Sequence, residues 1–152
     1  MTHDIDLVVR IPSEAIDSLL AAFPLPDYLL QEASVRDAIC RKSMVNLLSL
    51  KDGEKVDFWI FADDPFDQSR FSRRQVVSVG NVTFSVSSPE DTILYKLHWS
   101  NLYGGSEKQF KDALRVYEVQ GMALDHDYLD EWALKLHVEK LWRRLKASAK
   151  LI

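Results

Sequence analysis

Two short dipeptides constrain the fold of this 152-residue chain more than any other feature. Asp52-Gly53 stands between the β-forming runs MVNLLSL and KVDFWIF, and Gly80-Asn81 stands between QVVSV and VTFSV. A short glycine-containing turn between two runs of β-formers is the strongest local signal for a hairpin. Both pairings are therefore predicted to be antiparallel and local in sequence.

The pattern of the chain changes at Ser88. Before it, DIDLVV has the composition of a strand, and helical spacing is found in residues 12–23, in residues 34–42 with Ser34 as cap, and after Asp64-Pro65. From Ser88, which suits a helix cap with Pro89 behind it, helices are expected near residues 88–102, 106–119, 126–136 and 138–149. We therefore predict an α+β fold, with a small mixed β-sheet and flanking helices in residues 1–87 and a helical lobe in residues 88–152.

Composition and charge exclude several classes of protein. A hydrophobic fraction of 47% with 28% charged residues is typical of a globular protein, and no apolar run is long enough to cross a bilayer. The net charge of −4 argues against a general phosphate-binding surface. The single cysteine, Cys40, excludes an internal disulfide and fits a reducing compartment. We expect a cytoplasmic protein with no membrane partner.

Three aspartates form the candidate catalytic and metal site. Asp4 and Asp6 alternate along DIDLVV and therefore share one face of a strand, while Asp57 interrupts the apolar run KVDFWIF. A carboxylate in so apolar a run is costly unless it is paired or binds a metal. If the two strands are adjacent, the three acids would hold Mg²⁺, or Mn²⁺, as in phosphoryl and nucleotidyl transfer. The alternative is that the acids lie at solvent-facing strand ends and pair with lysines such as Lys55.

Three segments carry a resemblance to a known family. They are THDIDLVVRIPSEAIDSLLAAF, GEKVDFWIFADDPFDQSRFSRR and SPEDTILYKLHWSNLYGGSEKQFKDALRVYEVQG. In this order they resemble bacterial nucleotidyltransferase-like proteins related to the AbiE-type toxins, of the polymerase-β-type nucleotidyltransferase superfamily, over nearly the full chain. The resemblance implies a small mixed sheet followed by a helical lobe, and transfer of a nucleotide from an NTP to RNA, protein or another acceptor.

The resemblance also implies roles for individual residues. Asp4 and Asp6 match the family's metal-binding pair, and Asp57 matches its third acid. Lys96 matches a lysine near the phosphates and Asp112 an acid at the mouth of the site, so both are candidate nucleotide-binding residues. For Asp112 an alternative is a surface pair with Lys108 or Arg115, four residues before it or three after it on a helix. A basic cluster formed by Arg70, Arg73 and Arg74 could steer RNA or an NTP toward the carboxylates. The alternative is that these arginines lie at a solvated helix end.

One departure from the family supports a second hypothesis. Active members carry a Gly-Ser or Gly-Gly turn ahead of the Asp-x-Asp strand, where backbone N–H groups cradle the triphosphate. Here only Met1, Thr2 and His3 precede Asp4, so we expect a core truncated at its N-terminus. The alternative function is a catalytically degenerate binding module or a toxin/antitoxin-type partner subunit. Its partner would be a cognate protein, or a second copy joined through an exposed sheet edge beside the first strand.

Overall fold

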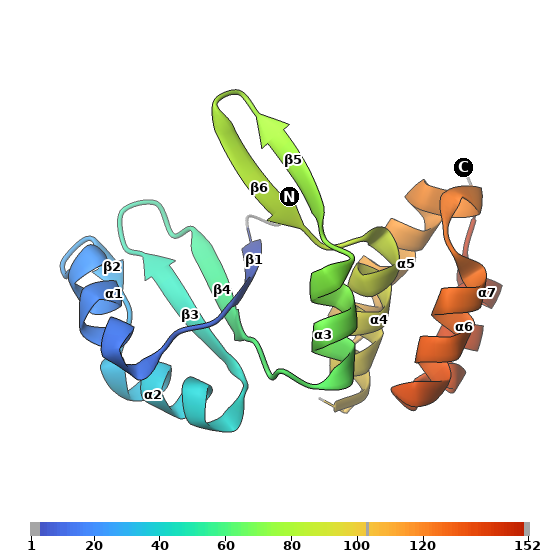
Figure 1. Ribbon diagram of the computed structural model, residues 1–152, viewed down its shortest axis with the longest axis horizontal. Helices are drawn as coiled ribbons and strands as arrows, with labels where there is room; N and C mark the ends of the chain where they lie inside the picture. The colour runs from blue at the N-terminus through green and yellow to red at the C-terminus, as the bar shows by residue number, and fades with distance from the viewer. Residues whose placement is uncertain (1–3, 103, 151–152) are drawn as a thin grey trace. The chain divides into compact units, whose positions relative to one another are not determined.

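The computed structural model describes residues 4–102 and 104–150, with the backbone alone for Asp4. The chain divides into two compact units, Met1–Asp64 and Pro65–Ile152, and each is described by itself (Figure 1). Among the described residues, no helix combines the length and the apolar content that a membrane span requires.

The first unit is built on a four-stranded mixed sheet. Its strands, in spatial order, are β1 (Asp4–Val9), β4 (Lys55–Ile60), β3 (Met44–Ser49) and β2 (Tyr28–Leu29). β3 pairs antiparallel with β4 across the Asp52-Gly53 turn, as predicted, and β1 pairs parallel with β4. The sequence therefore predicted a small mixed sheet correctly, although it missed the two-residue strand β2.

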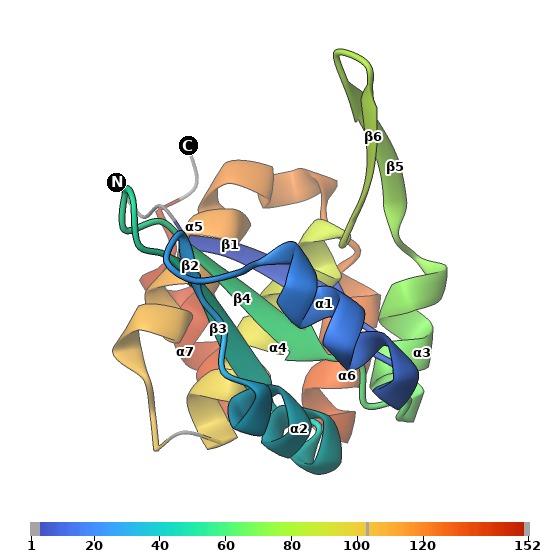
Figure 2. The same cartoon turned by 90° about the vertical axis from the view of Figure 1, so that its left-hand side faces the viewer.

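Two helices cover one face of this sheet. They are α1 (Ile16–Ala22), which follows the short 3₁₀ helix η1 (Ser13–Ala15), and α2 (Glu32–Arg41) (Figure 2). Ile16 and Val35 are buried against the strand residues Val45, Leu47, Phe58 and Ile60. The assignment of Ser34 as the cap of the second helix was wrong. The helix is already formed at that point, because the Val35 N–H donates to the Gln31 carbonyl at 3.0 Å.

The second unit is mostly helical. Its helices are α3 (Pro65–Ser72), α4 (Pro89–Leu102), α5 (Glu107–Gln120), the 3₁₀ turn η2 (Gly121–Ala123), α6 (His126–Lys135) and α7 (Glu139–Ser148). The expected helices therefore exist, with ends displaced by a residue or two. Phe66 of α3 is buried in the same core as Leu97 and Leu129. Because α3 packs there, the two units divide after Asp64, whereas the sequence had placed the boundary after residue 87.

Ser88 caps the start of α4, as the sequence predicted. The Asp91 N–H donates to Ser88 Oγ at 3.1 Å, and Ser88 Oγ–H donates to Asp91 Oδ2 at 2.7 Å. Both side chains are buried. Ser88 Oγ thus satisfies one backbone donor of the first turn, the Asp91 N–H, and the Asp91 carboxylate holds the Ser88 hydroxyl in place.

The second predicted hairpin precedes α4. Its strands are β5 (Gln75–Val79) and β6 (Val82–Val86), with Val79 opposite Val82. Gly80 has a φ of 59°, which suits the first central residue of a type II′ turn. The prediction of a two-residue hairpin turn here is confirmed.

Candidate functional site

The two parallel strands β1 and β4 bring carboxylates together. Asp6 is in register with Asp57. Side chains in register on neighbouring strands point to the same face of a sheet, so these two lie together on the face opposite the core under α1 and α2. Asp4, two residues before Asp6 on β1, is in register with Lys55. The side chain of Asp4 lies outside the described part of the structure.

Asp57 is buried in the middle of β4, with 6% of its surface exposed. Asn46 Nδ2, from the opposing position on β3, donates a hydrogen bond to Asp57 Oδ1. Lys55 Nζ lies 3.1 Å from Asp57 Oδ2. The pair with Lys55 that the alternative predicted is therefore present. Asp57 is buried, however, and does not lie at a solvent-facing strand end. The cost of burying this carboxylate is offset by one amide donor and one ammonium.

Asp6 is exposed and has a partner on the neighbouring strand. The indole Nε1–H of Trp59 donates to Asp6 Oδ1 at 3.1 Å. Trp59 follows Asp57 by two residues, so the same strand alternation that orients Asp57 also orients Trp59. This hydrogen bond fixes the direction of one oxygen of the exposed Asp6 side chain.

These groups offer the kind of oxygen donors that Mg²⁺ and Mn²⁺ prefer. Within the described residues, three acidic, histidine or cysteine side chains do not come together in a metal-binding group. Among the described side chains, Asp6 and Asp57 supply two carboxylates at matched positions of β1 and β4. At Asp57, a divalent cation would have to replace the Lys55 ammonium, which lies 3.1 Å from Oδ2.

Lys96 and Asp112 form an ion pair in the helical unit. Lys96 Nζ on α4 lies 3.6 Å from Asp112 Oδ2 on α5, with 17% and 39% of the side chains exposed. Asp112 thus pairs with the other nucleotide-binding candidate, whereas the surface alternative named Lys108 or Arg115. The long side chain of Lys96 is therefore mostly buried, and its ammonium lies near the more exposed Asp112.

Two arginines of the predicted basic cluster have structural roles in the helical unit. Arg70 is 5% exposed, with its guanidinium 2.5 Å from Asp67 and stacked over the Tyr95 ring. Arg73 lies within 3.4 Å of Glu90 and Asp91. The hypothesis that these two arginines steer RNA or an NTP is therefore disfavoured, because their charges are already paired with buried acids.

Tyr128 completes this buried network. Its hydroxyl donates to Asp91 Oδ1 at 2.6 Å and lies 3.0 Å from Ser69 Oγ, and the Arg73 guanidinium lies 3.8 Å from the centre of its ring. Burial and the hydrogen bond to Asp91 raise the pKa of Tyr128, so the phenol stays protonated and remains a donor. The network joins α3, α4 and α6 and has the character of a structural element.

Sequence reasoning missed Asn46 and the hydrogen-bonding role of Trp59. Trp59 could have been found, since it alternates with Asp57 along one strand and carries a polar N–H. Asn46 gave a weaker signal, a single polar residue between Val45 and Leu47. Its position opposite Asp57 depends on the register set by the hairpin.

Comparison with protein families found no family model that matches the chain. Comparison with curated proteins found no match either. The nucleotidyltransferase resemblance therefore stays a prediction that depends on the residues quoted above.

Proposed function

We propose that this protein is a metal-dependent nucleotidyltransferase that transfers a nucleotide from an NTP to an RNA or protein acceptor. The observation that carries the proposal is the register of β1 and β4, which aligns Asp6 with Asp57 on one face. Asp4, Asp6 and Asp57 would hold Mg²⁺ or Mn²⁺. The bound metal would neutralise the triphosphate and orient the attacking and leaving oxygens.

The neighbouring residues have supporting roles in this proposal. Trp59 orients Asp6, and Asn46 orients Asp57, through the hydrogen bonds described above. Side chains held in this way are arranged before the ligand arrives, so less ordering has to accompany binding. The nucleotide-binding role that the resemblance implies for Lys96 would require its ion pair with Asp112 to open.

The test is NTP binding in the presence and absence of Mg²⁺. In calorimetry with each of the four common NTPs, the wild-type chain is expected to bind at least one of them in a Mg²⁺-dependent manner. Asp57→Asn should weaken this binding by more than about 100-fold, because even the outer-shell partners of metal ligands cost roughly 10–100-fold. The asparagine keeps an acceptor for Asn46, so the sheet should still form.

Asp17→Asn is the matched control. Asp17 is an exposed acid on α1, in the same unit but on a helix that covers the other face of the sheet. The Asp17→Asn variant should bind the NTP with the affinity of the wild type. Absence of Mg²⁺-dependent heat for the wild type with every NTP at millimolar concentration would refute the enzymatic proposal.

Lys55 provides a second prediction about the same site. Replacing Lys55 by methionine should raise the affinity for Mn²⁺ about 5-fold or more, since a unit charge about 4 Å away is worth ~1 kcal/mol even in bulk water. Its ammonium competes with the cation for Asp57 Oδ2, 3.1 Å away. Electron paramagnetic resonance of free Mn²⁺ measures the affinity directly.

Lys51→Met serves as the control for this experiment. Lys51 is exposed in the turn between β3 and β4, and its replacement removes the same charge from another place in the unit. An equal change of Mn²⁺ affinity in both variants would mean that only net charge matters, and an unchanged affinity in Lys55→Met would separate Lys55 from the metal site.

A second candidate function is a non-catalytic binding module or a toxin/antitoxin-type partner subunit. Two observations favour it. Asp6 and Asp57 already accept hydrogen bonds from protein donors, and β1 is an edge strand whose Ile5 and Leu7 are 55% and 43% exposed. An uncovered edge with apolar side chains suits pairing with a strand of a cognate protein or of a second copy. Light scattering that shows a strict monomer, with no partner in stoichiometric amount after co-expression with neighbouring genes, would argue against it.

A further inference from the structure

The β5–β6 hairpin stands apart from the core of the helical unit. All ten of its strand residues are exposed. Figures 1 and 2 both show it projecting away from α3 and α4, the helices that precede and follow it. An isolated two-stranded hairpin is marginally stable in water, and a hydrophobic face usually has to be covered.

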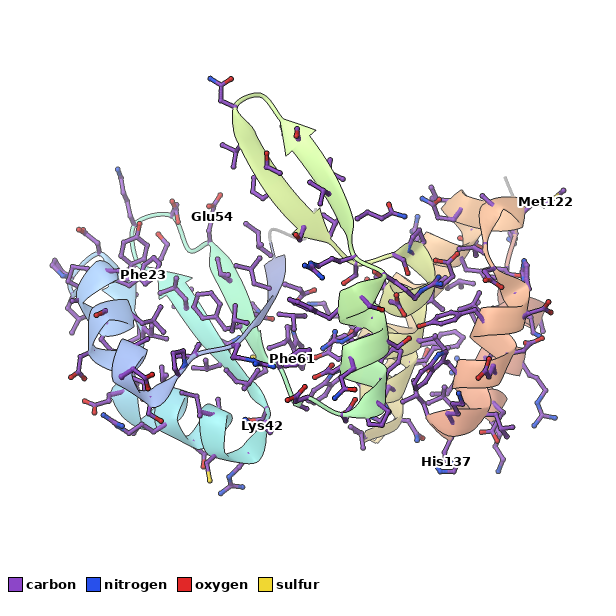
Figure 3. The ribbon with its side chains drawn as sticks, viewed as in Figure 1. Phe23, Lys42, Glu54, Phe61, Met122 and His137 are labelled. Carbon is purple, nitrogen blue, oxygen red and sulfur yellow. The ribbon has the colours of Figure 1, made fainter. Side chains whose placement is uncertain are left out.

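The two faces of the hairpin differ in polarity. The register places Val77 opposite Phe84 and Val79 opposite Val82, and residues in register share a face. One face therefore consists of apolar side chains with a single glutamine, namely Gln75, Val77, Val79, Val82, Phe84 and Val86. The five apolar members are 39–65% exposed. The other face carries Val76 with Ser78, Thr83 and Ser85. Figure 3 shows side chains projecting from both faces of the hairpin.

The hairpin also lacks the features that keep natural sheet edges from pairing. Residues 75–88 contain no charged residue and no proline, in a chain with 28% charged residues. Natural proteins protect exposed strands with lysine, proline or a bulge. An apolar face of this kind, bounded by unprotected edges, is typical of an interaction surface.

We propose that the apolar face of the β5–β6 hairpin binds the same hairpin of a second copy of this chain. The charge of the chain decides between possible occupants. With a net charge of −4, two copies repel each other, and contact is least costly where both surfaces are uncharged. A nucleic acid or an anionic membrane surface would require basic residues, which the hairpin lacks. A two-fold contact places valines and Phe84 against the same side chains of the other copy.

The size of the face sets the strength of the expected dimer. Five-residue strands are about 17 Å long and paired strands lie about 5 Å apart. One face of the hairpin is therefore small compared with the ~800 Å² that each partner of a stable complex buries. The dimer should be reversible, with a dissociation constant of roughly 10–1000 µM.

Sedimentation velocity of the full chain between about 5 and 1000 µM tests the proposal, with a concentration range that brackets the expected dissociation constant. The wild type should change from monomer to dimer across this range. Phe84→Lys places a charge in the centre of the apolar face and should leave a monomer throughout. Ser85→Lys adds the same charge to the next residue, which faces the opposite way, and should retain dimerisation within about 3-fold, as expected for a residue outside the interface.

Each outcome decides the question. A wild type that stays monomeric at the highest concentration overturns the proposal. A dimer that persists in Phe84→Lys also overturns it. If the dimer is lost in Leu7→Lys but kept in Phe84→Lys, the contact belongs to the β1 edge. Circular dichroism and tryptophan fluorescence, to which the buried Trp142 contributes, report whether each variant is folded. The hairpin substitutions should leave both unchanged because no core residue is altered. The result does not depend on NTP binding.

Discussion

Replacing Arg70 by methionine is expected to lower the free energy of unfolding of the helical unit by about 3–5 kcal/mol, the usual cost of breaking a buried ion pair from one side. Arg70 and Asp67 are 5% and 4% exposed and their charged groups are in contact. The substitution leaves the Asp67 carboxylate buried beside an apolar side chain. It also removes the contact of the guanidinium with the Tyr95 ring, 4.1 Å from its centre.

Urea unfolding followed by tryptophan fluorescence measures this loss, because three of the four tryptophans, Trp99, Trp132 and Trp142, belong to the helical unit. The double variant Arg70→Met with Asp67→Leu is the control. It removes both charges and should recover most of the stability, since a buried pair replaced by apolar residues is often neutral. A single variant that loses less than about 1 kcal/mol would show that the pair is solvated in solution, as exposed pairs are.

Truncating Leu129 to alanine should destabilise the same unit by about 2–5 kcal/mol, the range for large-to-small changes in a core. Leu129 on α6 is 0% exposed and belongs to the core that includes Leu97, Phe110 and Trp142. The substitution removes buried apolar surface and leaves a cavity that neighbouring helices can fill only in part.

Leu134 offers a matched control on the same helix. It is 61% exposed, so Leu134→Ala removes the same atoms from a side chain that contributes little to the core. Its effect on the free energy of unfolding should stay within about 0.5 kcal/mol. Equal losses in the two variants would contradict the assignment of Leu129 to the core, and both are measured by the same urea titration.

The local elements of this protein could be predicted from the sequence to a large extent. Short-range signals decide them, as the turns at Asp52-Gly53 and Gly80-Asn81 and the Ser88–Asp91 cap show. Each of these depends on residues only a few positions apart, whose preferences are strong enough to act without the rest of the chain. The error at Ser34 has the same origin. Ser34 suits a cap, but the apolar positions Val35 and Ala38 bind α2 to the sheet and the helix begins earlier.

The candidate site was predictable in part. The alternation of Asp4 and Asp6 and the isolation of Asp57 in an apolar run point to the residues, and Lys55 was named as a partner in the alternative. The other partners, Asn46 at Asp57 and Trp59 at Asp6, follow from strand register. The ion pair between Lys96 and Asp112 follows from the packing of α4 on α5. Both arrangements join residues that are far apart in the sequence, so no local pattern predicts that they meet.

By itself the sequence determined the helices, the two hairpins and the order of sheet before helices, because backbone propensity and turn chemistry act over a few residues. Only the tertiary structure decided that β1 joins β4 in parallel, that α3 belongs to the helical core and that one face of the β5–β6 hairpin is apolar and uncovered. The first two features arise from burial of apolar surface between distant segments, and the third is a face that no such burial covers. Many pairings satisfy the same local preferences, and the free energy of packing selects one of them.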